Sequence, residues 1–233
     1  FVTGVQTCAL PIYHRSGWLD HIDYGTNAGV AGGSAPAKVM FAAEDRCITP
    51  GATCVSSNAG NWPDVPWDQQ CTSGACPDKV SPTFFSQKRL SKITTQVWGG
   101  SAYRDVDSWT LIHRFLNPGD TSSAALWLEA IRHTGLVGTS ASVPEVNFNE
   151  VSLSNRVDID GDTLPPLARF RVAAIINETG GDLSVQYSQR ECNRKIGVMP
   201  SAPESNVMRC LPTYWTPPGS PRSEEHTSEL QSR

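Results

Sequence analysis

The sequence predicts a mainly β protein of antiparallel strands and hairpins, interrupted by one long disulfide-stapled loop. Three observations carry this prediction. Short runs rich in β-branched and aromatic residues alternate with polar residues, as half-buried strands do. Turn-forming residues, with 19 glycines and 17 prolines, are spread through the chain. Long apolar patterns with helical spacing are scarce, so little helix is expected.

Each expected strand is a short alternating run bounded by turn formers. In chain order the runs are 16–25, 36–43, 88–100, 103–115, 126–135, 145–153, 168–181 and 182–188. The glycine pairs within 98–101 (WGGS) and 179–182 (TGGD) separate neighbouring runs and predict hairpin turns. Residues 124–132 remain ambiguous, because the spacing of Leu126, Trp127 and Ile131 permits a helix while the neighbouring strands favour a strand.

Residues 44–87 break the alternation and predict a long irregular excursion from the sheet. The stretch carries four cysteines and five prolines, and it contains Trp62 and Trp67, which we expect to fold back as apolar plugs. Loops of this length without secondary structure are usually functional, stapled or disordered.

Proximity along the chain suggests three disulfides, which link Cys47 to Cys54, Cys71 to Cys76 and Cys192 to Cys210. With Cys8 set aside, because it lies in the adapter-like N-terminal end described below, six cysteines remain and allow 15 pairings, so this connectivity is a hypothesis. An even number of cysteines in short loops favours a secreted or cell-surface protein. Structural zinc is the alternative, but the spacing lacks the close cysteine pairs of a zinc ribbon and no histidine lies nearby.

The two ends of the chain resemble translated sequencing adapter. Residues 222–232 fit the in-frame translation of a short-read adapter, and residues 2–12 fit its reverse complement. We therefore expect residues 1–12 and 222–233 to be adapter-derived tails with few contacts, and residues 13–221 to be the β-rich segment.

Asp158, Asp160 and Asp162 form a weak calcium candidate, because carboxylates at alternate positions can converge on one hard cation. The spacing does not match the hand-type calcium loop, whose glycine is sixth and whose glutamate is twelfth. The alternative is a polar turn, for which aspartate and glycine are common. No other cofactor is expected.

The residues favour a non-enzymatic protein. A nucleophile elbow and a phosphate-binding loop are both missing from the sequence. His113 and His133 lie in strand-like runs, where a histidine on a sheet face is the ordinary interpretation. The net charge of −4 argues against nucleic acid as a partner, and no apolar run reaches the length of a membrane span. A surface hydrolase remains a weak alternative.

Several runs resemble actinobacterial Rhs (YD-repeat) proteins. They include RLSKITTQV at 89–97, SAYRDVDSWTL at 101–111, ALWLE at 125–129 and VAAIINETGGDLSVQY at 172–187, with Cys192, 203–206 and Cys210 beyond them. Members of this family are large exported polymorphic toxins whose repeats wind into a hollow β shell around a toxin domain. The resemblance implies a segment of a larger β shell, and it brings no catalytic residue with it.

Two functions are therefore expected from the sequence. The first is a scaffold section of an Rhs-like toxin or wall-associated protein, whose partners are the remainder of its own shell and an enclosed toxin domain. The alternative is a carbohydrate-binding β domain that binds cell-surface glycans. Its sugar platform would be formed by exposed tryptophans, for which Trp62, Trp67, Trp98 or Trp109 are the candidates, and a coplanar exposed row would favour this function. Burial of these tryptophans would favour the scaffold instead.

Overall fold

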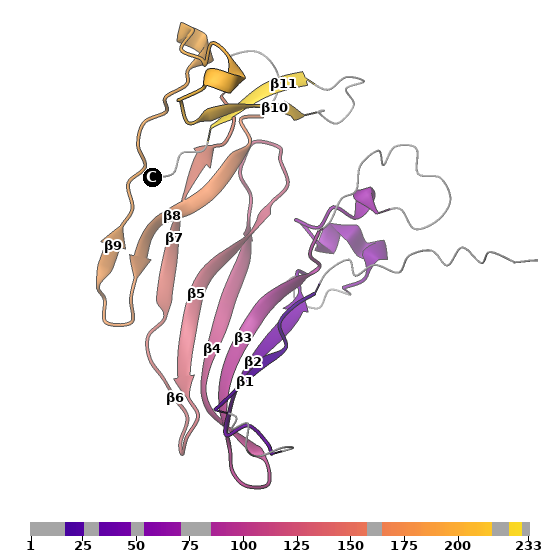
Figure 1. The fold of residues 1–233 in the computed structure, drawn as a ribbon, viewed down its shortest axis with the longest axis vertical. Coiled ribbons are helices and arrows are strands. Elements are labelled where there is room, and N and C mark those ends of the chain that lie inside the picture. Colours follow the sequence, from indigo (N-terminus) through magenta and orange to yellow (C-terminus); the bar gives the residue numbers. More distant parts are fainter. Residues whose placement is uncertain are drawn as a thin grey trace, which may run out of the picture.

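A computed structural model describes residues 17–25, 33–47, 54–70, 85–157, 165–215 and 224–229. Its main feature is one nine-stranded antiparallel sheet, ordered β1-β2-β3-β4-β5-β7-β8-β9, with β6 also paired to β5 (Figure 1). Strands that follow one another in the chain are mostly neighbours in the sheet. The predicted fold class, mainly antiparallel β, is confirmed.

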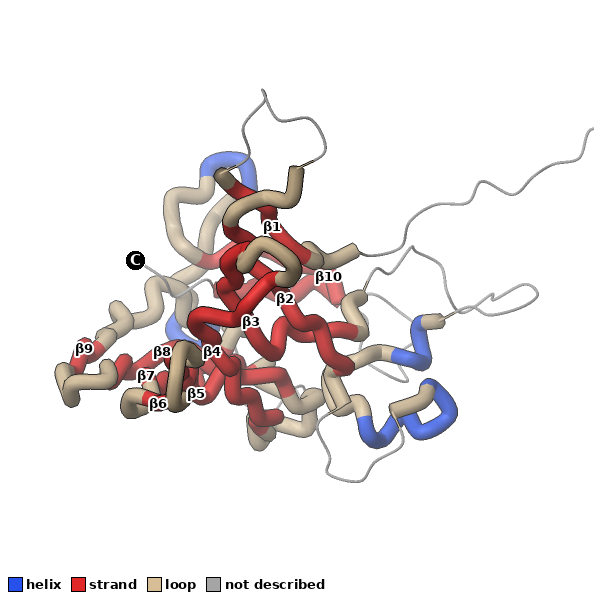
Figure 2. The backbone as a smooth tube through the Cα atoms, turned by 90° about the horizontal axis from the view of Figure 1, so that it is seen from below, coloured by secondary structure: helices blue, strands red, loops and turns tan. Residues whose placement is uncertain are grey.

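The strands of this sheet differ widely in length. They are β1 (His21–Tyr24), β2 (Ala37–Asp45), β3 (Lys88–Trp98), β4 (Tyr103–Leu116), β5 (Ala125–Gly135), β6 (Ala141–Ser142), β7 (Val146–Ser154), β8 (Ala168–Ile176) and β9 (Asp182–Ser184). Viewed from below, they follow a bent line from β1 to β9, so the sheet is strongly curved (Figure 2).

Both predicted hairpins form at the glycine pairs. Between β3 and β4, Gly99 donates its N–H to the carbonyl of Ala102 at 2.9 Å, and Gly100 takes a φ of 91° that favours glycine. Between β8 and β9, Gly180 has a φ of 85°. The side chain of Asn177 closes this second turn by accepting the N–H of Gly181 at 2.7 Å.

Residues 125–135 form strand β5, which resolves the ambiguity between helix and strand. Leu126 lies opposite Phe115, and Trp127 lies opposite Arg114 on β4. The indole of Trp127 donates to the carbonyl of Phe148 on β7 at 3.1 Å. Pairing along β4 therefore overrides the helical spacing, and a bulge absorbs the irregularity where the register shifts beside Ile112.

The paired registers give the sheet two different faces. One face is mainly hydrophobic, and we call its members the apolar face. They are Ile22, Val39, Phe41, Ile93, Trp109, Leu111, Ile131 and Val146. The other, the polar face, includes Lys38, Lys92, Thr94, Gln96, Ser108, Thr110, Arg132 and Thr134. The polar face also carries Met40, Ile112 and the buried Ser108 and Ala130, so the two faces differ in composition more than in exposure.

No second layer covers the apolar face in the described part of the chain. Each of its eight members is half-buried or exposed, and Ile22 at the edge is 45% exposed. The buried hydrophobic residues that the structure describes are few, and most are small or lie outside the sheet. They are Ala35, Trp62, Val65, Leu116, Ala130, Val157, Ala168, Cys192 and Cys210.

The excursion begins later than the sequence predicts, because Glu44 and Asp45 still belong to β2. Two short 3₁₀ helices follow, at Ser56–Asn61 and Trp67–Gln69. The carboxylate of Asp64 binds the guanidinium of Arg46 and accepts the N–H of Leu126 on β5 at 3.3 Å. This contact fastens residues 54–70 to the upper end of the sheet.

A second, two-stranded sheet pairs β10 (Cys210–Trp215) with β11 (Glu224–Glu229) (Figure 1). It follows two short 3₁₀ helices, at Arg194–Ile196 and Pro203–Ser205. The pairing of β11 differs from the expectation that residues 222–233 make few contacts. Any stretch that can extend next to an open strand edge can satisfy that edge's backbone groups, whatever its origin. The side chains of β11 are outside the described part.

Candidate functional site

Trp62 and Trp67 pack together in the excursion. Trp62 is 4% exposed, and its indole donates to the carbonyl of Val55 at 3.2 Å. The rings of Trp62 and Trp67 are 5.2 Å apart and nearly perpendicular, at 88°, and Phe85 packs edge-on against Trp67. These contacts hold the excursion together, as expected of apolar plugs.

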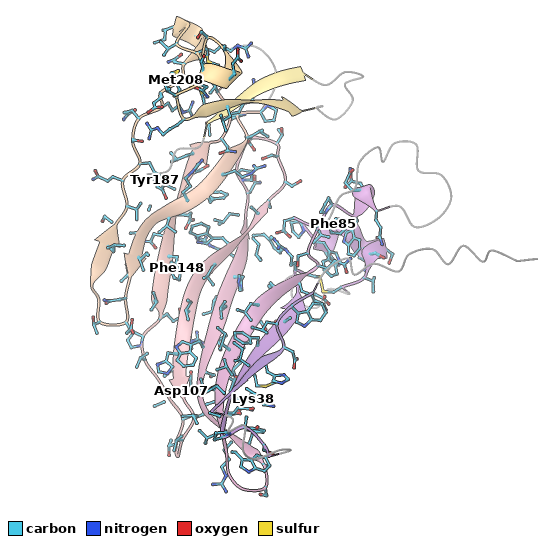
Figure 3. The ribbon with its side chains drawn as sticks, in the orientation of Figure 1. Lys38, Phe85, Asp107, Phe148, Tyr187 and Met208 are labelled. Atoms are coloured by element: carbon cyan, nitrogen blue, oxygen red, sulfur yellow. A yellow bond between two sulfur atoms is a disulfide. The ribbon has the colours of Figure 1, made fainter. Side chains whose placement is uncertain are left out.

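Trp98 lies at the opposite end of the sheet, beside the β3–β4 turn. It contacts its cross-strand partner Tyr103 with ring centroids 5.1 Å apart. Tyr103 in turn donates its hydroxyl to the carbonyl of Ala35, and the ammonium of Lys38 lies 4.5 Å from its ring centroid (Figure 3 labels Lys38). The cluster ties the hairpin to the start of β2.

Trp109 stacks on His133, its partner across β4 and β5. The ring centroids are 4.8 Å apart and the planes differ by 5°. The carboxylate of Asp107, which lies near the lower end of the sheet in Figure 3, hydrogen-bonds to the same imidazole. The distance from His133 Nε2 to Asp107 Oδ1 is 2.9 Å. Gly135 is the residue directly opposite Asp107 on β5.

The Asp107–His133 pair resembles the base and orienting acid of a hydrolase, but it lacks the third component. In the part of the chain that the structure describes, no hydroxyl or thiol hydrogen-bonds to the His133 ring. Nucleophilic catalysis needs such a group within hydrogen-bond reach of the base. The arrangement therefore fits a cross-strand contact that stabilises β4 against β5.

The four candidate tryptophans do not form one sugar platform. Trp62 is buried and stands perpendicular to Trp67, while Trp98 and Trp109 lie at separate positions on the sheet. A platform for stacking sugars needs exposed, roughly coplanar rings. Trp62 and Trp67 therefore do not offer a coplanar exposed pair, because they pack against each other at a right angle.

Two of the three expected disulfides form. Cys47 is bonded to Cys54, and Cys192 to Cys210. Both sulfurs of the second bond are fully buried, in a small core with Val157, Met199 and Met208 (Figure 3 labels Met208). Cys71 and Cys76 lie outside the described residues.

The calcium candidates Asp158, Asp160 and Asp162 also lie outside the described residues. Within the described ranges, no group of three or more histidine, cysteine, aspartate or glutamate side chains is arranged to hold a metal ion. The helices there are also too short and too polar to cross a membrane.

The sequence did not indicate a cavity of about 470 Å³ beside the outer edge of β2. Trp18 and Leu19 form one wall, and Phe41, Ala43 and Leu90 form the other. Its lining is mostly apolar, and its volume lies in the range of small-ligand sites. Trp18 and Leu19 come directly before the edge strand β1 and are 58% and 54% exposed.

Two titratable groups have shifted pKa values. Burial lowers the pKa of His113, and the neighbouring guanidinium of Arg89, 3.3 Å away, lowers it further. Burial tends to raise the pKa of Asp120, but hydrogen bonds from Ser122 and Ala168 outweigh burial and lower it. The contacts of His113 with Arg89 and of Asp120 with Ala168 are distant in sequence, so spacing along the chain could not have predicted them, whereas Ser122 is only two residues from Asp120.

Searches against protein-family models, curated proteins and solved structures find no match to this chain.

Proposed function

We propose that this chain is a non-enzymatic structural unit, a curved β wall whose apolar face is covered by another part of a larger exported assembly. The observation that supports the proposal most is the apolar face itself. Hydrophobic side chains from six strands share one side of the sheet, and no described residue buries any of them fully. A contiguous apolar surface of this kind usually marks an interaction site.

The two disulfides support export, because such bonds persist mainly in oxidising compartments. The resemblance of residues 89–97 and 172–187 to Rhs proteins makes a toxin shell our preferred identity for the assembly. The carbohydrate-binding alternative has less support, because Trp62 is buried and perpendicular to Trp67.

The proposal can be tested with two matched double variants of the full chain. Ile93→Thr with Leu111→Thr alters the apolar face on β3 and β4, while Met40→Thr with Ile112→Thr makes a similar change on the opposite face of the sheet, on β2 and β4. The wild-type chain should self-associate through its uncovered face. We expect the first pair to weaken association in sedimentation velocity by roughly tenfold, and the second pair to leave it unchanged.

Circular dichroism separates this result from misfolding, since all three proteins should keep the spectrum of a β protein. A wild-type chain that stays monomeric at every concentration would contradict the proposal. If Ile93→Thr with Leu111→Thr unfolds the protein and the control pair does not, the proposal is also contradicted, because the apolar face would then already be buried in a closed core.

A further inference from the structure

The outer edge of β2 is only partly occupied. β1 pairs with it from Ala37 to Met40, and Phe41 donates its N–H to the carbonyl of Asp20 at 2.8 Å. Beyond that bond the chain at 17–19 separates from β2. No other strand in the described ranges lies along the outer side of residues 43–45.

Alternation along β2 shows which backbone groups are left at this edge. The carbonyl of Ala42 points toward β3, where it accepts the hydroxyl of Ser91, and the N–H of Arg46 points the same way, to the carbonyl of Gln87. Since successive residues of a strand point in opposite directions, the N–H and C=O of Ala43 and Asp45 point outward, as those of Phe41 do. These four backbone groups form a short row that pairs with no strand in the described ranges, and we call this row the ladder.

The apolar cavity lies next to these outward-pointing backbone groups, because Phe41 and Ala43, which carry such groups, also line the cavity. Its charged neighbours are already paired. Lys88 contacts Asp45 at 2.6 Å, and Arg89 contacts Glu44 at 2.8 Å. The cavity therefore favours an uncharged side chain from a ligand over an acidic or basic one.

We propose that this edge binds an extended peptide strand from another polypeptide, which pairs with Ala43 and Asp45 and inserts one large apolar side chain between Trp18 and Leu90. Backbone hydrogen bonds supply affinity and the cavity supplies selectivity, as in other cases of strand addition. The inference goes beyond the proposed wall function because it depends on the free edge of β2, although Phe41, which lines the cavity, also belongs to the apolar face.

The test uses the full chain and labelled seven-residue peptides, Lys-Thr-Thr-X-Thr-Thr-Lys, in fluorescence anisotropy. With phenylalanine or leucine at X the peptide should bind, and with aspartate at least about tenfold more weakly. N-methylation of X should abolish binding, because the residue opposite Ala43 exchanges both of its backbone hydrogen bonds with it, whereas N-methylation of the threonines flanking X, whose N–H groups point away from β2, should not.

Two variants probe the protein side. Ala43→Pro removes an outward N–H without removing a bond to β3, and it should abolish binding while unfolding stays cooperative. Val137→Ser, at an exposed position far along the chain, is the matched control and should bind normally. Failure of the phenylalanine peptide to bind folded protein overturns the proposal, as does binding that survives both N-methylation of X and Ala43→Pro. A third outcome also overturns the proposal: the protein binds no peptide but self-associates, and Ala43→Pro abolishes this self-association. The edge would then bind a second copy of the chain.

Discussion

Asp120 accepts the backbone N–H of Ala168 at 2.6 Å and so joins the β4–β5 connection to the first residue of β8. The two residues beside this contact, Thr121 and Leu167, have φ values of 68° and 50°. Among the described residues they are the only non-glycine positions in the left-handed region. Backbone strain is thus concentrated where two distant parts of the sheet meet, and the carboxylate holds them together.

Removing this carboxylate should destabilise the sheet. Asp120→Asn keeps the size of the side chain but weakens its bonds to Ala168 and Ser122, so we expect unfolding to become easier by about 1 to 2 kcal/mol. Urea denaturation at pH 7 measures the change. The lowered pKa of Asp120 means that its stabilisation is present above the unfolded pKa and is lost as pH falls through the folded value. The gap between wild type and variant should therefore close below about pH 4. A gap that persists at pH 2.5 contradicts this role.

Relieving the strain at Thr121 should have the opposite effect. The side chain is exposed, so Thr121→Gly loses little packing while it removes the cost of a positive φ. We expect a gain of about 0.5 to 1 kcal/mol in thermal unfolding. Thr139→Gly is the control, because that exposed residue has no positive φ and its replacement should bring no gain. Equal responses at both sites would argue against strain.

His113 should make the protein sensitive to mild acid. Its pKa is lowered by burial and by Arg89, so the folded protein favours the neutral ring. As pH falls below about 6.5, the unfolded state takes up the proton first and stability declines until the folded pKa is reached. His113→Gln should flatten the pH dependence of the free energy of unfolding between pH 7.5 and 5. An unchanged slope would place the titrating group elsewhere.

Reduction of the disulfides should loosen local regions and leave the large sheet paired. The Cys192–Cys210 bond closes a separation of 18 residues and the Cys47–Cys54 bond one of 7. The entropic model gives about 2 to 3 kcal/mol for loops of this size. Hydrogen exchange after mild reduction should show faster exchange around 191–211 and 46–55, with strands β3, β4 and β5 still protected. Loss of protection throughout the sheet would show that these bonds stabilise the whole fold.

The strands and their turns could be predicted because their signals are local. The glycine pairs at 99–100 and 180–181 specify hairpins, and alternation in 103–115 specifies a strand. Residues 124–132 could not be decided locally, since the choice depends on pairing with β4. The pairing of β11 was also missed, because an exposed edge accepts almost any extended neighbour.

The candidate site was predicted less well than the fold. The cysteine pairs 47–54 and 192–210 followed from proximity, and Trp62 as an apolar plug followed from its position in the excursion. The contact of Asp120 with Ala168 spans 48 residues, and the cavity beside Ala43 depends on where β1 ends. Such features arise from register and bulges, which side-chain patterns do not encode.

Oxidative footprinting of the dilute full chain tests most directly whether the apolar face is open. Hydroxyl radicals should modify Tyr24, which follows Ile22 by two residues on the same side of β1 and is 47% exposed, and the half-buried Trp109, while Trp62 at 4% exposure stays protected. Modification of Tyr24 and Trp109 well above that of Trp62 is the predicted result. Protection of Trp109 equal to that of Trp62, in monomeric protein, would show that the face is already covered and would contradict a wall that requires a partner.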